Sequence, residues 1–522
     1  MQFQRAGIAL FFLTLMSSGA YAVTATEQKI LERLEKLERD QAELKQQLHV
    51  KDQRIKELES QLALPSAPVT QTTSASPTVS STTSASTTNT PSAVIPTTSA
   101  ATQQSVVDAA AEQNALPEKE TPEYYGDFTP GRGFSLAKTP YGSMDFTAFS
   151  YLRYLNQNGL DDTYTDSFGN VKNIDQRNDL QLQKVMLYFK GWVFDPKLRY
   201  LFYTWTSNTS QGDGAQVVVG GYLNYSFSEK FILGGGIYGL PSVRSMEGQW
   251  PSLLKVDYRT ITDEYFRGSY TTGFFAQGTL AEGWQYKAMI GNNLSQLGVN
   301  AAQMDDTFNT YSLATWWMPT TGEYGPDQGF GDFEQHENFA TRLGFHFTSS
   351  TEDKQSQPGK DDPENSQIRI SDGTAIFDLN AFGPGTQIEQ ADYQMISFDA
   401  GFKYQGFALE GEYYWRTVDQ FKYVGTLPFD ELSDDGFQLQ ASYMLLPKSL
   451  QVYLSGSQIN GEYGDPYDVS LGLNWFPYTG NRKIRVNTEL LYLKDSPVGY
   501  TSVPFALGGN GTVFSTHFEF AF

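Results

Sequence analysis

The sequence has 522 residues, no cysteine and a formal net charge of −22. This charge disfavours nucleic-acid binding, which needs a basic surface. Without cysteine the chain has no disulfides, no thiolate metal sites and no lipid-modified N-terminal Cys. Hydrophobic residues make up only 39% of the chain, yet 14% are aromatic. That combination is typical of strands that alternate a polar with an apolar face.

The N-terminus has the pattern of a secretory signal peptide. Arg5 precedes an apolar stretch over 8–16, and Ala20 and Ala22 supply the small residues of a cleavage site. We predict a signal peptide over 1–22 and a mature chain that starts at Val23. No later segment approaches about 18 uninterrupted apolar residues, so we expect no helical membrane anchor.

Residues 23–64 carry a heptad repeat, which predicts an α-helical coiled coil. The apolar seam that would mediate oligomerisation consists of Ile30, Leu34, Leu37, Leu44, Leu48, Ile55, Leu58 and Leu62. Gln41 and Lys51 interrupt the seam and would help to fix its register. Both a dimer and a trimer fit this pattern, and the alternative is a single charged helix in solvent. Residues 65–122 are rich in Ser, Thr, Pro and Ala and predict a disordered linker.

Residues 123–522 alternate polar and apolar side chains between turns, which predicts an all-β fold. Phe398, Ala400, Phe402 and Tyr404 alternate with polar or small residues, and a second such strand follows the turn at 406–407. Short turns at 194–197, 228–230 and 446–449 alternate with long polar connections at 157–179, 349–373, 419–436 and 455–468. This asymmetry predicts an antiparallel transmembrane β-barrel of about 16 strands.

The last nine residues place Phe514, Phe518, Phe520 and Phe522 on alternate positions. They would form one aromatic face of a closing barrel strand, with lipid outside. The ending resembles the assembly signal of Gram-negative outer-membrane proteins, carried here by Phe518, Phe520 and Phe522. A buried last strand of a soluble sandwich is the alternative.

The body resembles the phosphate-selective porin O and P superfamily of outer-membrane channels. The resemblance rests on Gly131-Arg-Gly-Phe-Ser-Leu, on the stretch 436–448 that ends in Leu-Leu-Pro-Lys, and on Leu471-Gly-Leu-Asn-Trp. It implies a Gram-negative outer-membrane porin that forms a homotrimer, in which one loop folds inward to narrow the pore. The candidates for that loop are 239–257 and 319–334.

Charged residues on the lumen side of the predicted strands are the candidate pore lining. They are Arg153, Arg342, Asp399, Lys403, Glu410, Glu412, Arg416 and Arg485. Each could equally form an ordinary salt bridge within the wall. The resemblance implies passage of anions such as phosphate along arginines, and Arg153, Arg199, Arg259 and Arg267 could supply a ladder. Residues 123–522 hold 27 Lys+Arg and 46 Asp+Glu, an acidic balance that argues against attracting anions.

The sequence therefore predicts passive diffusion of small hydrophilic solutes or ions. The four His show no motif that pairs them with Ser and a carboxylate, so we predict no enzyme, and no cofactor or metal. The expected partners are outer-membrane lipid and lipopolysaccharide. The alternative function is an envelope tether, in which a periplasmic coiled coil links the outer membrane to the periplasm and binds peptidoglycan.

Overall fold

The computed structural model describes residues 127–129, 133–207, 216–247, 253–296, 307–325, 328–355, 363, 365–478, 480, 482, 484–499 and 503–521. The predicted signal peptide, coiled coil and linker over 1–122 lie outside these residues, as does Phe522. The fold below is that of the barrel body.

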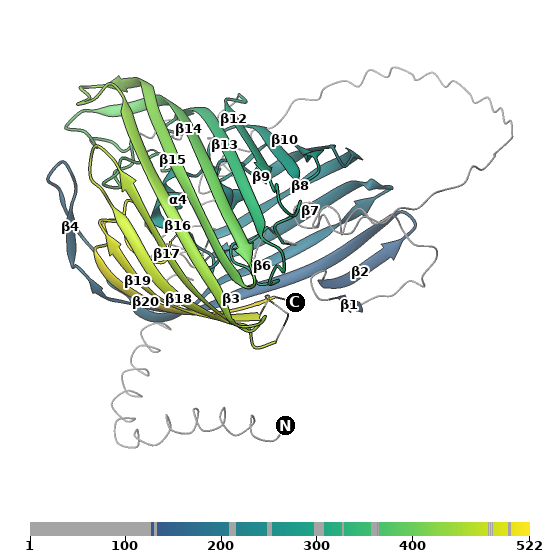
Figure 1. The fold of residues 1–522 in the computed structure, drawn as a ribbon. Helices are drawn as coiled ribbons and strands as arrows, with labels where there is room; N and C mark the ends of the chain where they lie inside the picture. Colours follow the sequence, from purple (N-terminus) through teal and green to yellow (C-terminus); the bar gives the residue numbers. More distant parts are fainter. Residues whose placement is uncertain are drawn as a thin grey trace, which may run out of the picture. The chain divides into compact units, whose positions relative to one another are not determined.

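The described body is a closed antiparallel barrel of 16 strands, as the sequence predicted (Figure 1). The strands are β3 Gly142–Leu160, β6 Asn178–Val193, β7 Asp195–Ser207, β8 Gln216–Ser228, β9 Phe231–Gly239, β10 Tyr270–Ala281, β11 Trp284–Gly291, β12 Thr310–Trp317, β13 Ala340–Asp353, β14 Gln387–Tyr404, β15 Phe407–Val424, β16 Leu432–Leu446, β17 Leu450–Asn460, β18 Tyr467–Trp475, β19 Ile484–Lys494 and β20 Gly511–Ala521. Each pairs with the next, and β20 closes on β3 with His517 opposite Arg153. Closure leaves no unpaired sheet edge, which is what a membrane-spanning sheet requires.

Short elements flank the wall. β1 Asp127–Thr129 pairs with β2 Gly133–Thr139, and β2 pairs with the first residues of β3, before the part that β20 covers. β4 Thr163–Thr165 and β5 Val171–Asn173 form a separate two-stranded sheet. The connection from β9 to β10 holds the turn η1 Arg244–Met246 and the helix α4 Ile261–Phe266. In the described parts of the chain, no helix has the length and apolar character needed to cross a membrane.

The two faces of the wall differ in chemistry. One row across β14, β15 and β16 is half-exposed and points outward: Phe398, Tyr413 and Phe437. The next row is buried and points inward: Asp399, Glu412 and Gln438. An outer surface this rich in exposed aromatic and aliphatic side chains is suited to lipid. Phe514 and Phe518 belong to this outer surface, in agreement with the predicted aromatic face of the last strand.

Several strands run further than their sequence indicated. The connection predicted at 419–436 is reduced to 425–431, because β15 extends to Val424 and β16 begins at Leu432. Polar cross-strand bonds hold these extensions: Asp435 accepts hydrogen bonds from Tyr413 at 3.0 Å and from Asn460 at 2.8 Å. The polar stretch therefore forms strand where its side chains can pair with side chains of the neighbouring strand.

Candidate functional site

All eight sequence-predicted lumen residues lie on the inner face of the wall, between 0% and 5% exposed. They are Arg153, Arg342, Asp399, Lys403, Glu410, Glu412, Arg416 and Arg485. Most of them contact two segments folded into the barrel. We call residues 240–269 the inner loop and residues 318–339 the rim loop. The sequence suggested one inward loop from these two regions, whereas parts of both contact inward-facing wall residues.

The inner loop is held to β13–β15 by buried ion pairs. Arg244 of the loop bonds through Nε to Oε2 of Glu410 at 3.0 Å, and its backbone N–H donates to Glu412 at 3.0 Å. Glu247 of the loop accepts from Arg342, whose Nε also donates to Asp399 at 2.8 Å. Removing one partner of such a buried pair leaves the other charge buried without a partner, which destabilises the protein by about 3–5 kcal/mol. The loop is therefore a fixed part of the barrel interior.

The same loop is bound to β17–β20. Arg485 donates to the carbonyl oxygens of Leu253 at 2.9 Å and Leu254 at 3.3 Å, and it pairs with Glu519 at 2.7 Å. Lys255 of the loop lies 3.2 Å from Glu489. Arg485, which was predicted to face the pore on this side of the barrel, is thus covered by loop backbone.

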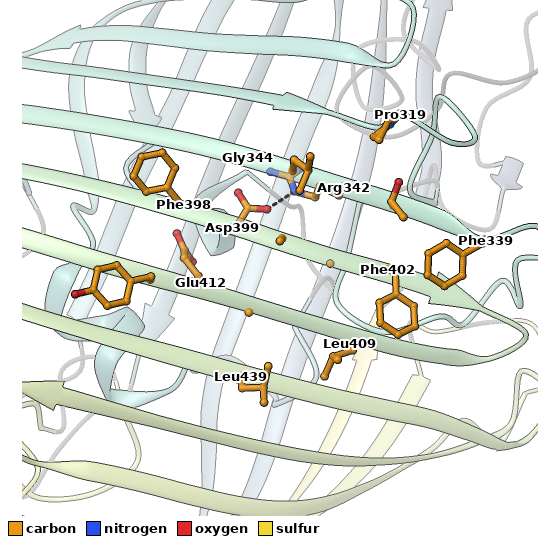
Figure 2. Close-up of a pocket in the computed structure, with 16 residues that line it drawn as sticks. Pro319, Phe339, Arg342, Gly344, Phe398, Asp399, Phe402, Leu409, Glu412 and Leu439 are labelled. Atoms are coloured by element: carbon orange, nitrogen blue, oxygen red, sulfur yellow. Dashed lines mark hydrogen bonds and ion pairs between the residues drawn. The ribbon is translucent and has the colours of Figure 1, made fainter.

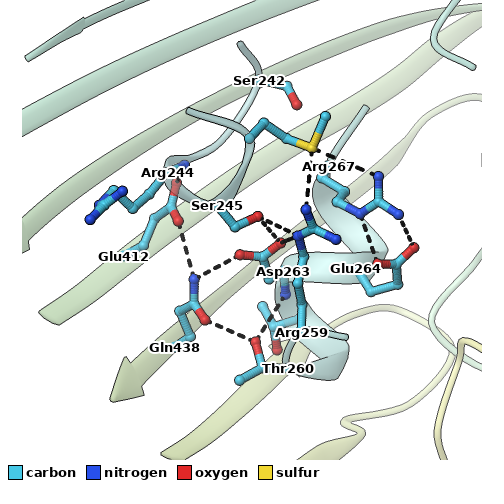
Figure 3. Close-up of polar contacts among 12 residues, drawn as sticks. Ser242, Arg244, Ser245, Arg259, Thr260, Asp263, Glu264, Arg267, Glu412 and Gln438 are labelled. Atoms are coloured by element: carbon cyan, nitrogen blue, oxygen red, sulfur yellow. Dashed lines mark hydrogen bonds and ion pairs between the residues drawn. The ribbon is translucent and has the colours of Figure 1, made fainter. Parts of the chain in front are cut away.

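Helix α4 adds a polar network, which Figure 3 shows, and an aromatic stack. Asp263 accepts from Ser245 at 2.7 Å and from Gln438 of β16 at 3.0 Å, and Thr260 caps the helix N-terminus. The ring of Phe266 stacks on Tyr414 of β15, with centroids 5.2 Å apart and planes 3° from parallel. These contacts bury the helix against the wall from both its polar and its apolar sides.

The rim loop meets the inner loop. Lys403 of β14 donates to the rim-loop carbonyl oxygens of Tyr324 at 2.8 Å and Gly329 at 2.5 Å. Arg244 of the inner loop donates to the carbonyl oxygen of Gln328 at 2.5 Å, and its guanidinium lies 4.6 Å from the ring centroid of Phe330. The described parts of the two loops together cover the inner face of β13–β20.

The opposite side of the barrel is different, because inner-face residues of β6–β9 keep part of their surface exposed. These are Tyr188, Tyr203, Trp205, Tyr222 and Tyr238. Tyr188 stacks on inward-facing Phe149 at 5.1 Å, and Tyr238 stacks on inward-facing Phe275 at 4.1 Å. Since the wall is closed, water that reaches these rings must come through the lumen. The open part of the lumen therefore runs along β6–β9.

The inner loop supplies the other side of this opening. Residues 256–260 alternate in exposure, so that Asp257 and Arg259 keep surface exposed while Val256, Tyr258 and Thr260 are buried. Asp257 pairs with Lys184 of β6 at 2.7 Å, and both side chains retain exposure (21% and 14%). Asp257 also has φ 63°, in the left-handed region, a strained conformation that surrounding contacts must hold.

We call this opening the tyrosine passage. It is lined on the wall by Lys184, Tyr188, Tyr203, Tyr222 and Tyr238, and on the inner loop by Asp257 and Arg259. Sequence reasoning named only Arg259 among these residues. Glycines on the inner face were the sequence signal for these aromatic rings. A Cβ at buried Gly220 would lie 2.4 Å from Cζ of Tyr203, and a Cβ at Gly234 would lie 2.2 Å from Cζ of Phe275. Rings lie flat over glycines that leave room for them.

The suggested arginine ladder does not assemble within the described residues. Arg153 bonds to His517 at 3.4 Å, Arg199 to the carbonyl oxygen of Pro196 at 2.8 Å, and Arg267 to Glu264 at 2.5 Å. These three arginines are buried, and each is held by different neighbours. Of the four suggested arginines, Arg259 alone borders the passage.

A hollow of about 910 Å³ lies on the outer surface of β13–β16 (Figure 2). Ala400 and Gly411 form its floor between the larger side chains of Phe398, Phe402 and Leu439. Its lining is mainly apolar, as expected of a surface that faces lipid.

Comparison with solved structures finds outer-membrane proteins. They include an anion-selective porin from Comamonas acidovorans (10% identity, 73% of this chain and 100% of that one, TM-score 0.46), the outer-membrane channel DcaP of Acinetobacter baumannii (8%, 74% and 99%, 0.46) and the trimeric OmpT of Vibrio cholerae (12%, 73% and 100%, 0.43). No family model and no curated protein sequence matches this chain, so the resemblance to the phosphate-selective superfamily stays a prediction. Such low identities and TM-scores leave solute and partners to be inferred from this chain's own residues.

Proposed function

We propose that the protein is a porin of the Gram-negative outer membrane, which lets small hydrophilic solutes diffuse passively through its barrel. The observation that carries this proposal is the closed wall with an apolar outside and a partly open inside. A soluble protein would have to cover the exposed outer aromatic residues, whereas lipid covers them in a membrane. The predicted signal peptide and the terminal Phe residues agree with this location.

The inner loop makes the channel narrow and sets its charge. The tyrosine passage carries Lys184, Asp257 and Arg259, and the first two form a pair. Arg259 lies 3.5 Å from the buried carboxylate of Asp263, which offsets its charge. Opposite charges within a narrow passage attract neither cations nor anions strongly. We therefore expect weak ion selectivity and no preference for phosphate.

Assembly as a homotrimer, with the heptad seam of Ile30–Leu62 joining the copies in the periplasm, is part of the proposal. The same segment supports the tether as a second role, since a coiled coil and linker could reach the peptidoglycan. Deleting residues 23–122 separates the two roles, because the channel lies wholly in the barrel body.

Conductance of the purified full-length protein in a planar bilayer tests the proposal. We expect stepwise channel openings and, under a salt gradient, a reversal potential close to zero. Sustained contact with the bilayer without any conductance would contradict the channel and favour the tether. A strong anion preference abolished by added phosphate would contradict the weak selectivity.

A further inference from the structure

The tyrosine passage offers two pairs of neighbouring tyrosine rings to any solute that enters it. Tyr188 of β6 lies opposite Tyr203 of β7 in the strand register, with ring centroids 5.5 Å apart. Tyr222 of β8 and Tyr238 of β9 lie 5.1 Å apart. Four neighbouring strands thus each contribute one partly exposed tyrosine to the same inner wall.

These rings are fixed before any solute arrives. Tyr203 lies over Gly220, and Phe275, which lies over Gly234, stacks on Tyr238. Tyr188 is held by stacking on Phe149. A rigid aromatic surface loses little conformational entropy when a ligand stacks on it, which makes it an efficient binding surface.

The passage also has hydrogen-bonding capacity to spare. Among the described residues, no hydrogen bond joins the hydroxyls of Tyr188, Tyr203 or Tyr222 to another group. Lys184 lies on β6 with Tyr188, Asp257 and Arg259 lie on the inner loop, and all three side chains are partly exposed. Apolar ring faces with donors and acceptors around them match a molecule that has flat C–H faces and hydroxyls around its edge.

We propose that the tyrosine passage binds neutral sugars in transit, with pyranose faces stacked on the tyrosine rings and sugar hydroxyls bonded to tyrosine hydroxyls and to the Lys184–Asp257 pair. Phosphate fits this lining poorly, because it has no apolar face and Asp257 balances Lys184. The inference rests on the proposed porin function and names the solute class for the same channel.

Block of the ion current by maltose is the test, carried out on the full-length protein in a planar bilayer. Maltose should reduce the current, and the reduction should saturate as the maltose concentration rises. The open-chain polyol sorbitol at equal concentration should lower the current only in proportion to its effect on the conductivity of the bulk solution. In the double variant Tyr188→Leu/Tyr203→Leu the concentration for half-block should rise about tenfold, because leucine keeps apolar bulk but offers no flat ring. Tyr443→Leu on the outer wall is the matched control and should leave the block unchanged.

The outcomes separate this inference from the function on which it rests. A protein that forms no channels contradicts both. Channels that maltose does not block, or that it blocks equally in the double variant, overturn the sugar inference and leave the porin intact. Block by benzoate without block by maltose overturns it as well, since the rings would then select aromatic solutes.

Discussion

At the scale of single residues, the charged groups of the inner wall act mainly as attachment points for the two loops. Arg342 is fully buried and joins Glu247 of the inner loop to Asp399 of β14. Strand alternation placed Arg342 on the inner face from sequence alone, because side chains of a strand alternate with a period of two. Its partner Glu247 could not be predicted, since the pair spans 95 residues and depends on how the loop folds.

Replacing this arginine should loosen the inner loop without opening the wall. Arg342→Gln leaves the carboxylates of Glu247 and Asp399 without a guanidinium, which should destabilise the attachment by about 3–5 kcal/mol. We expect larger and noisier single-channel currents and faster proteolysis within 240–269. The control Arg177→Gln removes a partly exposed pair with Asp179 and should change neither. Unaltered current noise in Arg342→Gln would contradict the role assigned to this pair.

His336 makes the rim loop sensitive to pH. Burial would lower the pKa of His336, but hydrogen bonds to Asp332 and Glu323 outweigh it and raise the pKa from 6.5 to about 9. Because the folded pKa lies above the unfolded one, the stabilisation is complete below pH 6.5 and is lost as the pH rises to about 9.

We therefore expect the protein in detergent to unfold at a lower temperature at pH 9.5 than at pH 6, and His336→Gln to reduce that difference. Thermal unfolding at several pH values measures this. Glu334→Gln, which breaks an exposed pair with Lys448, is the control and should shift stability by less than about 1 kcal/mol. An equal pH dependence in His336→Gln and the unmodified protein would show that other groups cause it.

At the scale of elements, the inner loop decides how much of the lumen stays open. A barrel of 16 strands encloses a water-filled channel unless something fills it. Here the described parts of the inner loop cover the inner face of β13–β20, whereas β6–β9 keep partly exposed rings and join the loop through the Lys184–Asp257 pair. The family resemblance implied an inward loop at 239–257 or 319–334. Which half of the wall it would cover follows from contacts such as Arg244–Glu410 that no local pattern encodes.

Shortening this loop should widen the channel. Replacing residues 244–266 with a short Gly-Ser linker removes α4 and the ion pairs, and we expect a several-fold larger conductance. The buried wall charges of β13–β15 would then face water, where they can be hydrated. Replacing the β4–β5 hairpin, residues 163–173, with the same linker is the control and should leave conductance unchanged. Equal conductance of all three proteins would mean that the inner loop does not restrict the passage.

At the scale of the whole molecule, strand number, closure and the apolar outside were predictable, whereas the position of the passage was not. Alternation and turn lengths specify a barrel of this size. Side chains alternate along every strand, so that one face of each strand meets lipid and the other faces the interior of the barrel. The passage arises from unequal filling of the interior, which depends on a few long-range contacts. Glycines under the rings, such as Gly220, were its only local trace.

Thiol accessibility in the open channel tests the central claim, that solutes pass along β6–β9 and not along β13–β20. The chain has no native cysteine, so a single introduced one reports alone. Val218 lies beside Trp205 on the inner wall of β8, and Ser455 is buried on the inner wall of β17. A charged thiol reagent should reduce the current through Val218→Cys channels and leave Ser455→Cys channels unaffected. Rapid modification of Ser455→Cys, with Val218→Cys inert, would contradict this position of the passage.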